Sequence, residues 1–341
     1  MKNTFLIIVL FLLYASVLKC QDIHFSQPAI NPGNPAFAGF SEYGSNLILA
    51  HRRQWIGIPN AQGFQTSQLS FDQQISVGKQ DYFGWGCILR SDKAGQVGLG
   101  NMEALATAAY RKRISKSNYL NAGINLGFQQ FRFNPGNTIS SNEFNTSTGE
   151  VTLQQGENNL LYNTIISPEL GAGILWQGSF GSSSTKSGYF MGSSLHHLIP
   201  SEKVFGGLGN PIPFRISFIG GLNIKAGYHN EIDPTMLFHR QGSLIDLNTG
   251  VSWRYFPRNN EPNLFFKIGG RTRFSNSTDR MKLDALIGEV GFHTTTGIGL
   301  GLSYDIHLLN TPTGANSLEL FLSYNWNQKS FQKRNVFCPH F

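Results

Sequence analysis

The side chains best suited to metal or acid–base chemistry in this sequence are histidines and carboxylates on predicted extended segments. His196 and His197 are adjacent and invite a metal-site interpretation. Neighbouring residues of a strand point to opposite faces, so this pair cannot bind one ion unless the strand is bulged. Asp305 and His307 are two residues apart and therefore share a face, where a hydrogen-bonded pair is favoured over a catalytic one.

Motifs that carry catalysis or bind cofactors are missing from the sequence. It contains no H-E-x-x-H motif, zinc-ligand spacing or EF-hand loop, and no G-x-S-x-G of a serine hydrolase. Gly297, Gly299 and Gly301 do not form a phosphate-binding loop, because no Lys-Ser/Thr pair or helix follows them. We therefore expect no enzymatic activity, no metal and no cofactor. A barrel hydrolase that uses Ser303 or His307 is the alternative.

The segment that holds Asp305 and His307 alternates strictly between apolar and polar residues. In residues 297–308 every even position is apolar or aromatic, and the odd positions are Gly, Ser, Asp or His. Residues 317–326 repeat the pattern, with Glu319 on the polar side and Phe321 as the exception. Such segments are typical of transmembrane β-barrel strands, which need about 9 to 11 residues. The alternation predicts that Asp305, His307 and Glu319 face the lumen.

Similar segments along the chain predict an all-β, transmembrane antiparallel β-barrel of about fourteen strands. Twelve strands is the alternative, because the ninth segment, residues 235–239, is short and follows Pro234. Charged residues make up only 14%, below the roughly 25% of soluble domains, and no internal apolar run reaches the ~20 residues of a membrane helix. Long external loops, such as residues 134–167, should alternate with short periplasmic turns, such as residues 114–118.

The ends of the chain differ in composition from the predicted barrel. Residues 1–20 are expected to be a secretory signal peptide, with Lys2 before an apolar core; acylation of Cys20 as a lipoprotein is the alternative. We expect a periplasmic N-terminal segment at residues 21–44, the outer-membrane β-barrel at 45–326 and a basic periplasmic C-terminal tail at 327–341. The net charge is +7, and the basic residues could line the lumen, contact the headgroups of outer-membrane lipid or bind an acidic partner. Nucleic acid is not expected to bind an exported barrel.

Short motifs at both ends of the chain resemble one known family. They are DIHFSQ at residues 22–27, NPAFAG at 34–39, HRRQW at 51–55, GLSYDI at 301–306, LEL at 318–320 and the terminal CPHF at 338–341. Their order and placement are similar to those of the PorP/SprF family. Two positions depart from its usual pattern: His51 replaces a tyrosine, and His340 replaces a basic residue.

The resemblance implies an outer-membrane barrel of the type IX secretion system of Bacteroidota, linked in some members to gliding motility. Such a protein would have no enzymatic activity. It would help deliver or anchor secreted adhesin-type cargo with a C-terminal sorting domain, and would connect to periplasmic machinery. A passive channel or hydrophobic-solute transporter is the rival function.

The resemblance also suggests partner-docking residues near the ends of the mature chain. These candidates are Phe25, Asn34, Pro35, Arg53, Trp55, Lys333, Arg334, Pro339 and Phe341. For the two terminal segments, a plug or clamp that closes the barrel is an equally open interpretation. Trp55 could instead belong to an aromatic girdle.

Overall fold

The chain forms a closed antiparallel β-barrel in a computed structural model. The structure describes residues 33–40, 44–56, 63–78, 80–94, 99–132, 164–181, 187–200, 212–242, 244–257, 263–275, 280–294, 296–308 and 316–327. A short 3-10 helix η1 (Pro35–Phe37) precedes the strands. The strands are β1 (Gly44–Ile56), β2 (Phe64–Val77), β3 (Asp81–Ala94), β4 (Leu99–Arg113), β5 (Asn118–Arg132), β6 (Thr164–Phe180), β7 (Ser187–His196), β8 (Arg215–Lys225), β9 (Asn230–Gln241), β10 (Leu244–Tyr255), β11 (Asn263–Ser275), β12 (Arg280–His293), β13 (Ile298–His307) and β14 (Asn316–Asn327).

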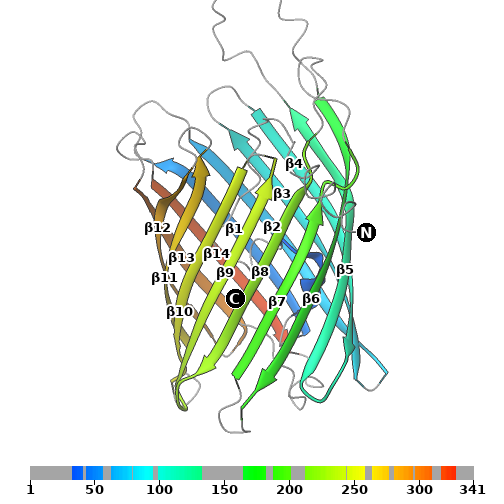
Figure 1. Cartoon of the computed structure of the whole chain (residues 1–341), viewed down its shortest axis with the longest axis vertical. Helices are drawn as coiled ribbons and strands as arrows, with labels where there is room; N and C mark the ends of the chain where they lie inside the picture. Colours follow the sequence, from blue (N-terminus) through cyan, green and yellow to red (C-terminus); the bar gives the residue numbers. More distant parts are fainter. Residues whose placement is uncertain are drawn as a thin grey trace, which may run out of the picture.

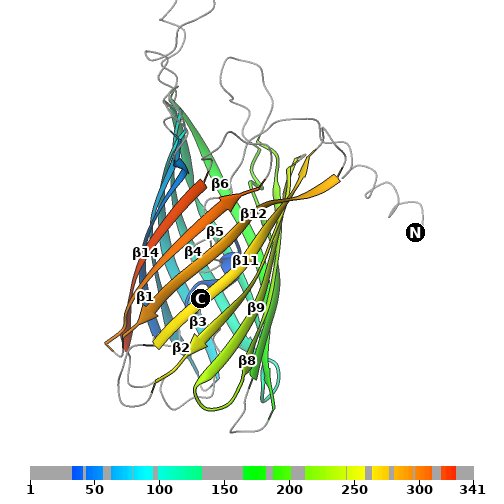
Figure 2. The ribbon, with the colours of Figure 1, turned by 90° about the vertical axis from the view of Figure 1, so that its left-hand side faces the viewer.

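Each strand pairs with its neighbours in sequence, and the first strand closes the barrel on the last (Figures 1 and 2). The β1–β14 register runs from Gly44↔Asn327 to Ile56↔Asn316, so pairing extends over the whole length of β1. Closure leaves no sheet edge, which allows every strand to satisfy its backbone groups without water. The predicted fourteen-stranded transmembrane barrel is confirmed, and the twelve-strand alternative is excluded.

The ninth strand is longer than the sequence suggested, although it contains a proline. β9 begins at Asn230 and includes Pro234. Its ladder with β8 pairs Gly221 with Thr235 and then resumes at Ile224 and Ile232, so it is interrupted beside the proline. A proline lacks the N–H that a continuous ladder would need, and the interruption removes that requirement.

Alternation gives the barrel an apolar outer face and a polar lumen. On β13 the residues at even positions, from Ile298 to Ile306, are exposed, whereas the residues at odd positions, from Gly299 to Asp305, are buried. The outward aromatic residues Trp85, Trp176, Trp253 and Trp326 all lie near the same end of their strands. Tryptophan is enriched where a membrane meets water, so this ring marks one membrane interface.

The two ends of the barrel differ in the length of their connections. We call the end where residues 133–163 join β5 to β6 the loop end. The opposite end, the turn end, has tight turns: Ile114 N donates to Asn118 O over 2.9 Å, and Ala226 N to Asn230 O over 2.8 Å. This asymmetry is that of barrels with short periplasmic turns and long external loops. The tryptophan ring lies at the turn end. The start of β1 and the end of β14, paired at Gly44 and Asn327, lie there too.

The inward glycines of the closing strands are covered by aromatic rings. A Cβ at Gly301 would lie 2.1 Å from Cζ of Phe321, and one at Gly291 would lie 2.3 Å from Cζ of Phe265. The two phenylalanine rings stack with their centroids 6.2 Å apart. Phe321, the exception to the sequence alternation, therefore points into the lumen and occupies the space that the glycines leave.

Candidate functional site

Residues 33–40, which we call the plug segment, lie inside the barrel (Figure 1). The segment contains η1 and contacts β4, β5 and β6 on their lumen side. Its own backbone forms a tight turn, since Phe37 N donates to Asn34 O, Ala38 N to Pro35 O, and Phe40 N to Phe37 O. Pro35 suits the first position of such a turn because its φ is fixed and no partner is needed for a backbone N–H.

Asn34 is the central anchor of the plug segment. Its side-chain oxygen accepts a hydrogen bond from Ala36 N at 2.9 Å and so caps η1. Its amide nitrogen donates to Ile174 O on β6 at 2.9 Å and to Ser193 O on β7 at 3.1 Å. The side chain is only 2% exposed, so these bonds replace contacts with water. One residue thus joins the turn to two adjacent strands.

Polar lumen side chains bind the remaining backbone of the plug segment. Ser194 Oγ and His196 Nε2 both donate to Gly33 O. Asn121 Nδ2 donates to Ala36 O at 3.3 Å. At the other end, Arg111 Nη2 donates to Gly39 O at 3.4 Å, and Gly39 N donates to Asp72 Oδ2 at 3.1 Å. Side chains from β2, β4, β5 and β7 therefore form hydrogen bonds with backbone groups along the whole segment.

Four inward glycines bring the plug segment close to the wall. A Cβ at Gly84 would lie 2.0 Å from Ala38 O, and one at Gly123 would lie 2.5 Å from Pro35 C. A Cβ at Gly173 or Gly192 would meet the Asn34 side chain at 2.1 Å or 2.8 Å. The glycines lie on β3, β5, β6 and β7. Any larger residue at these positions would clash with the segment, so the wall is shaped to receive it.

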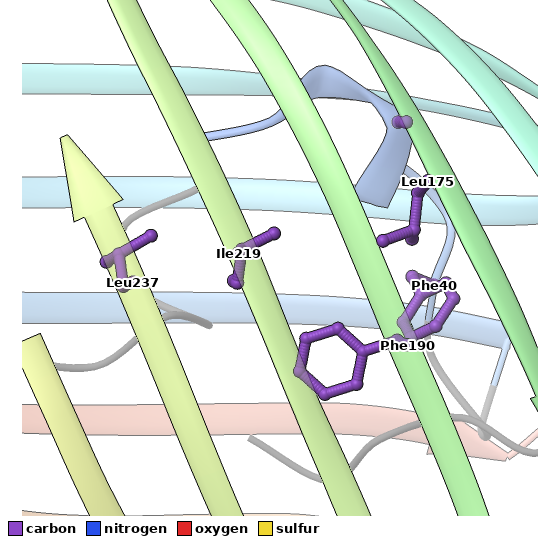
Figure 3. Packing of buried hydrophobic residues seen from close by; sticks show 6 residues of the cluster. Phe40, Leu175, Phe190, Ile219 and Leu237 are labelled. Atoms are coloured by element: carbon purple, nitrogen blue, oxygen red, sulfur yellow. The ribbon is translucent and has the colours of Figure 1, made fainter. Parts of the chain in front are cut away.

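Apolar side chains complete the seat of the plug segment (Figure 3). The buried cluster joins two residues of the segment to four on the wall: Ala36, Phe40, Leu175, Phe190, Ile219 and Leu237. The Arg111 guanidinium lies over the Phe40 ring, 4.7 Å from its centroid. Burial of these apolar groups stabilises the bound segment by roughly 25 cal/mol per Å² of apolar surface, in addition to the hydrogen bonds. The segment is packed into the wall as well as hydrogen-bonded to it.

A buried ion-pair network lies in the lumen toward the loop end. Arg52 donates to Asp305 Oδ2 at 2.5 Å and to Glu319 Oε2 at 3.0 Å, and all three side chains are at most 2% exposed. Asp305 and Glu319 face the lumen, and His307 lies on the same face of β13, partly buried. A buried carboxylate needs a partner to offset the loss of its hydration, and Arg52 is the partner of two.

Arg52 was missed by the sequence analysis, which selected Arg53 instead. Residues 47–50 are apolar on both faces of β1, so alternation did not show which arginine points inward. The register supplies the missing information, because Arg52 is directly opposite Glu319 on β14. If the first and last predicted strands are aligned as antiparallel neighbours in this register, Arg52 is the arginine that faces Glu319.

Further ion pairs continue around the lumen wall. Arg90 pairs with Glu103 at 2.7 Å, and Arg254 lies 3.3 Å from Asp233 and 3.6 Å from Glu231. These pairs join adjacent strands and so stabilise the contacts between neighbouring strands of the barrel wall. In the described part of the chain, no group of three or more His, Cys, Asp or Glu residues is placed to hold a metal ion.

His196 and His197 differ from the prediction that they point to opposite faces. The strand ends at His196, and His197 has a positive φ of 59°, which returns its side chain to the interior. Both residues are buried. They nevertheless have separate roles: His196 binds the plug segment, whereas His197 Nδ1 lies 2.6 Å from Glu169 Oε2.

The structure brings only some of the predicted docking residues together. Asn34 and Pro35 adjoin each other within the plug segment, so the described residues 33–40 of the predicted N-terminal segment lie inside the barrel. Arg53 and Trp55 lie on the outer face at the loop end, and Trp55, at a bulge in the β1–β14 ladder, packs edge-on against Phe64. Phe25, Lys333, Arg334, Pro339 and Phe341 lie outside the described residues.

Comparison with protein families gives one extensive match. The family described as "Type IX secretion system membrane protein PorP/SprF" matches residues 17–324. The match therefore includes the plug segment and all but the last residues of the closing strand. No curated protein sequence matches the chain. Among the described residues, no helix is long and apolar enough to cross a membrane.

Solved structures of similar shape are outer-membrane barrels. A mutant of the TodX monoaromatic hydrocarbon channel has a TM-score of 0.51 and 10% identity, covering 89% of this chain and 95% of that one. The P. putida toluene transporter TodX has a TM-score of 0.49 at 10% identity over 89% and 95% of the two chains. The Ralstonia pickettii toluene transporter TbuX has 0.48 at 11% identity over 90% and 96%. At such low identity the likeness concerns the fold alone.

Proposed function

The chain belongs to the PorP/SprF family of type IX secretion system membrane proteins, and we propose that it is a non-enzymatic docking component of that system. It would be exported through its signal peptide to the outer membrane. There it would help deliver or anchor adhesin-type cargo with a C-terminal sorting domain, and would link this cargo to periplasmic machinery.

The plug segment is the observation that supports a docking role most strongly. It is bound by side chains of four strands and by two backbone carbonyls of β6 and β7. Since buried backbone groups gain little by leaving such partners, the segment belongs to the resting state of the barrel. A barrel filled in this way serves better as a fixed platform than as an open conduit.

The turn end is the proposed face for the periplasmic partners. β1 begins and β14 ends there, paired at Gly44 and Asn327. The basic residues Lys333 and Arg334 and the C-terminal Pro339 and Phe341 follow β14 in the sequence. Together with Phe25, they are the proposed docking residues at this end. Arg53 and Trp55, at the opposite end of β1, would act on the cargo side.

A passive channel for hydrophobic solutes is the rival function. The solved structures named as hydrocarbon channels and toluene transporters share the fold. In favour of this rival, Phe190, Ile219 and Leu237 form an apolar patch on the lumen wall beside the plug segment. Transport would require the segment to leave its seat. The two functions therefore differ in whether secretion or solute passage depends on the protein.

Deletion of the gene in the host bacterium separates these functions. The docking proposal predicts the loss of one or more sorting-domain proteins from the cell surface, measured by quantitative proteomics of protease-shaved surface peptides. Uptake of a small aromatic solute should not change. A strain with normal surface proteins and reduced solute uptake would overturn the proposal.

Complementation provides the matched control for this deletion. The wild-type gene should restore surface display. A gene that ends after Asn327, the last residue of β14, should restore the barrel in the membrane without restoring display if the tail docks machinery. Full display by the truncated protein would remove residues 328–341 from the proposed docking surface.

A further inference from the structure

Three basic residues occupy one lateral row on the outer face of the barrel at the loop end. The registers connect Arg53 on β1 to Gln65 on β2, Gln65 to Lys93 on β3, Lys93 to Gly100 on β4, and Gly100 to Arg132 on β5. Adjacent strands are about 4.8 Å apart, so successive cations of the row are separated by about 10 Å. We call Arg53, Lys93 and Arg132 the basic row.

The basic row is exposed and, among the residues that the structure describes, has no acidic neighbours on its own face. All three side chains are exposed, and none forms an ion pair with a residue in the described part of the chain. The acidic residues described on β1–β5 point to the lumen, except Asp81, which lies at the turn end. The residues between the cations, Gln65 and Gly100, are uncharged. The row therefore presents an uncompensated positive strip.

An apolar surface lies beyond the basic row, separated from it by one row of mostly polar residues. One row further from the loop end, His51, Ser67 and Ser91 are polar, and His51 Nδ1 lies 2.9 Å from Ser67 Oγ. In the next row, Leu49, Leu69, Leu89, Ala104 and Phe128 are register neighbours. Leu49, Leu89 and Phe128 are each at least half exposed. Along β1, β3 and β5 the outward residues thus change from charged to polar to apolar with distance from the loop end, as they do across a membrane interface.

We propose that the basic row is a binding site for a phosphorylated lipid headgroup of the outer leaflet. The phosphates would meet Arg53, Lys93 and Arg132, and the acyl chains would lie along the apolar row beneath. A lipid fits better than an acidic protein, because the cations border the membrane-facing surface and do not lie on a loop. The site is independent of the plug segment, and it shares only Arg53 with the proposed docking residues.

Lipid binding by the purified full-length protein tests the proposal. Diphosphorylated lipid A is titrated in detergent, and binding is measured by native mass spectrometry. Neutralisation of the row in the Arg53→Gln/Lys93→Gln/Arg132→Gln variant should weaken binding about hundredfold, since each cation near an anionic surface contributes about fivefold. Unchanged affinity would overturn the proposal. Should the triple variant not fold, each single variant should lose about fivefold, and three unchanged singles would overturn it equally.

Two controls locate and identify the site. The Lys112→Gln/Lys116→Gln variant neutralises exposed cations at the turn end and should bind lipid A like the wild type; an equal loss would show that only net charge matters. Inorganic phosphate at millimolar concentration should not displace the lipid, and phosphatidylcholine should bind equally to wild type and triple variant. Displacement by phosphate alone would assign the row to free anions and overturn the lipid proposal.

Discussion

Replacing Gly123 by alanine should release the plug segment while leaving the barrel intact. An added Cβ at this position would lie 2.5 Å from the carbonyl carbon and oxygen of Pro35 and 2.6 Å from Ala36 N. These are backbone atoms that no rotamer change can move, so the segment must shift by about 1 Å to reach normal contact distance. Alanine is otherwise compatible with a strand.

The size of the effect follows from the bonds that hold the segment. Asn121 donates to Ala36 O at 3.3 Å, and Asn34 binds two carbonyls at 2.9 Å and 3.1 Å. A shift of this size stretches these three beyond hydrogen-bonding distance. Each hydrogen bond contributes about 1 kcal/mol. The free energy that holds the segment against the wall therefore falls by ~3 kcal/mol. Its amides should then exchange with solvent more than a hundred times faster.

Hydrogen–deuterium exchange with mass spectrometry measures this release directly. In the wild type, the amides of Ala36, Phe37, Ala38, Gly39 and Phe40 are all hydrogen-bonded, so a peptide covering them should be protected. Gly288→Ala is the matched control, because a Cβ there meets nothing within 4 Å. Equal protection in the Gly123→Ala protein, the control and the wild type would refute the idea that the glycine seats the segment.

Three further substitutions, one with a control variant and one with a compensating variant, test other contacts in the barrel. Asn34→Ala removes both bonds to the wall and the cap of η1, and should raise single-channel conductance in planar bilayers above that of the wild type; a closed Asn34→Ala barrel would contradict its role as anchor. Arg52→Gln leaves two buried carboxylates without their cation and should cost about 3–5 kcal/mol, seen as a lower unfolding temperature in heat-modifiability gels. Arg53→Gln, one residue further and outward, should stay within about 0.5 kcal/mol. Gly301→Ala should cost about 1–3 kcal/mol by overpacking against the Phe321 ring, and Phe321→Leu in the same chain should recover part of this loss; no recovery would refute the ring contact.

The fold could be predicted from the sequence because alternation repeats in nearly every strand. Residues 297–308 and 317–326 separate their two faces so clearly that the closing hairpin followed from period alone. Alternation did not predict the structure where the sequence itself does not alternate. The apolar stretch 47–50 hid which arginine points inward, and Pro234 made β9 look too short.

The plug segment could not be predicted in the same way. Its sequence has no period, and the partners that hold it are distant: Asn34 binds a carbonyl 159 residues away. The seat depends on four glycines that look alike in the sequence but lie on four strands of the wall. Only the register of the closed barrel brings them together, so the sequence left a plug and a docking surface equally open.

Partner identification from native membranes tests whether the protein is a docking component of the type IX secretion system. The tagged protein is purified from outer membranes of the host bacterium under mild detergent, and co-purifying proteins are quantified against an unrelated outer-membrane barrel that carries the same tag. Type IX secretion components should be enriched, together with a protein that ends in a sorting domain. Recovery of the barrel with no such proteins above the control would contradict it.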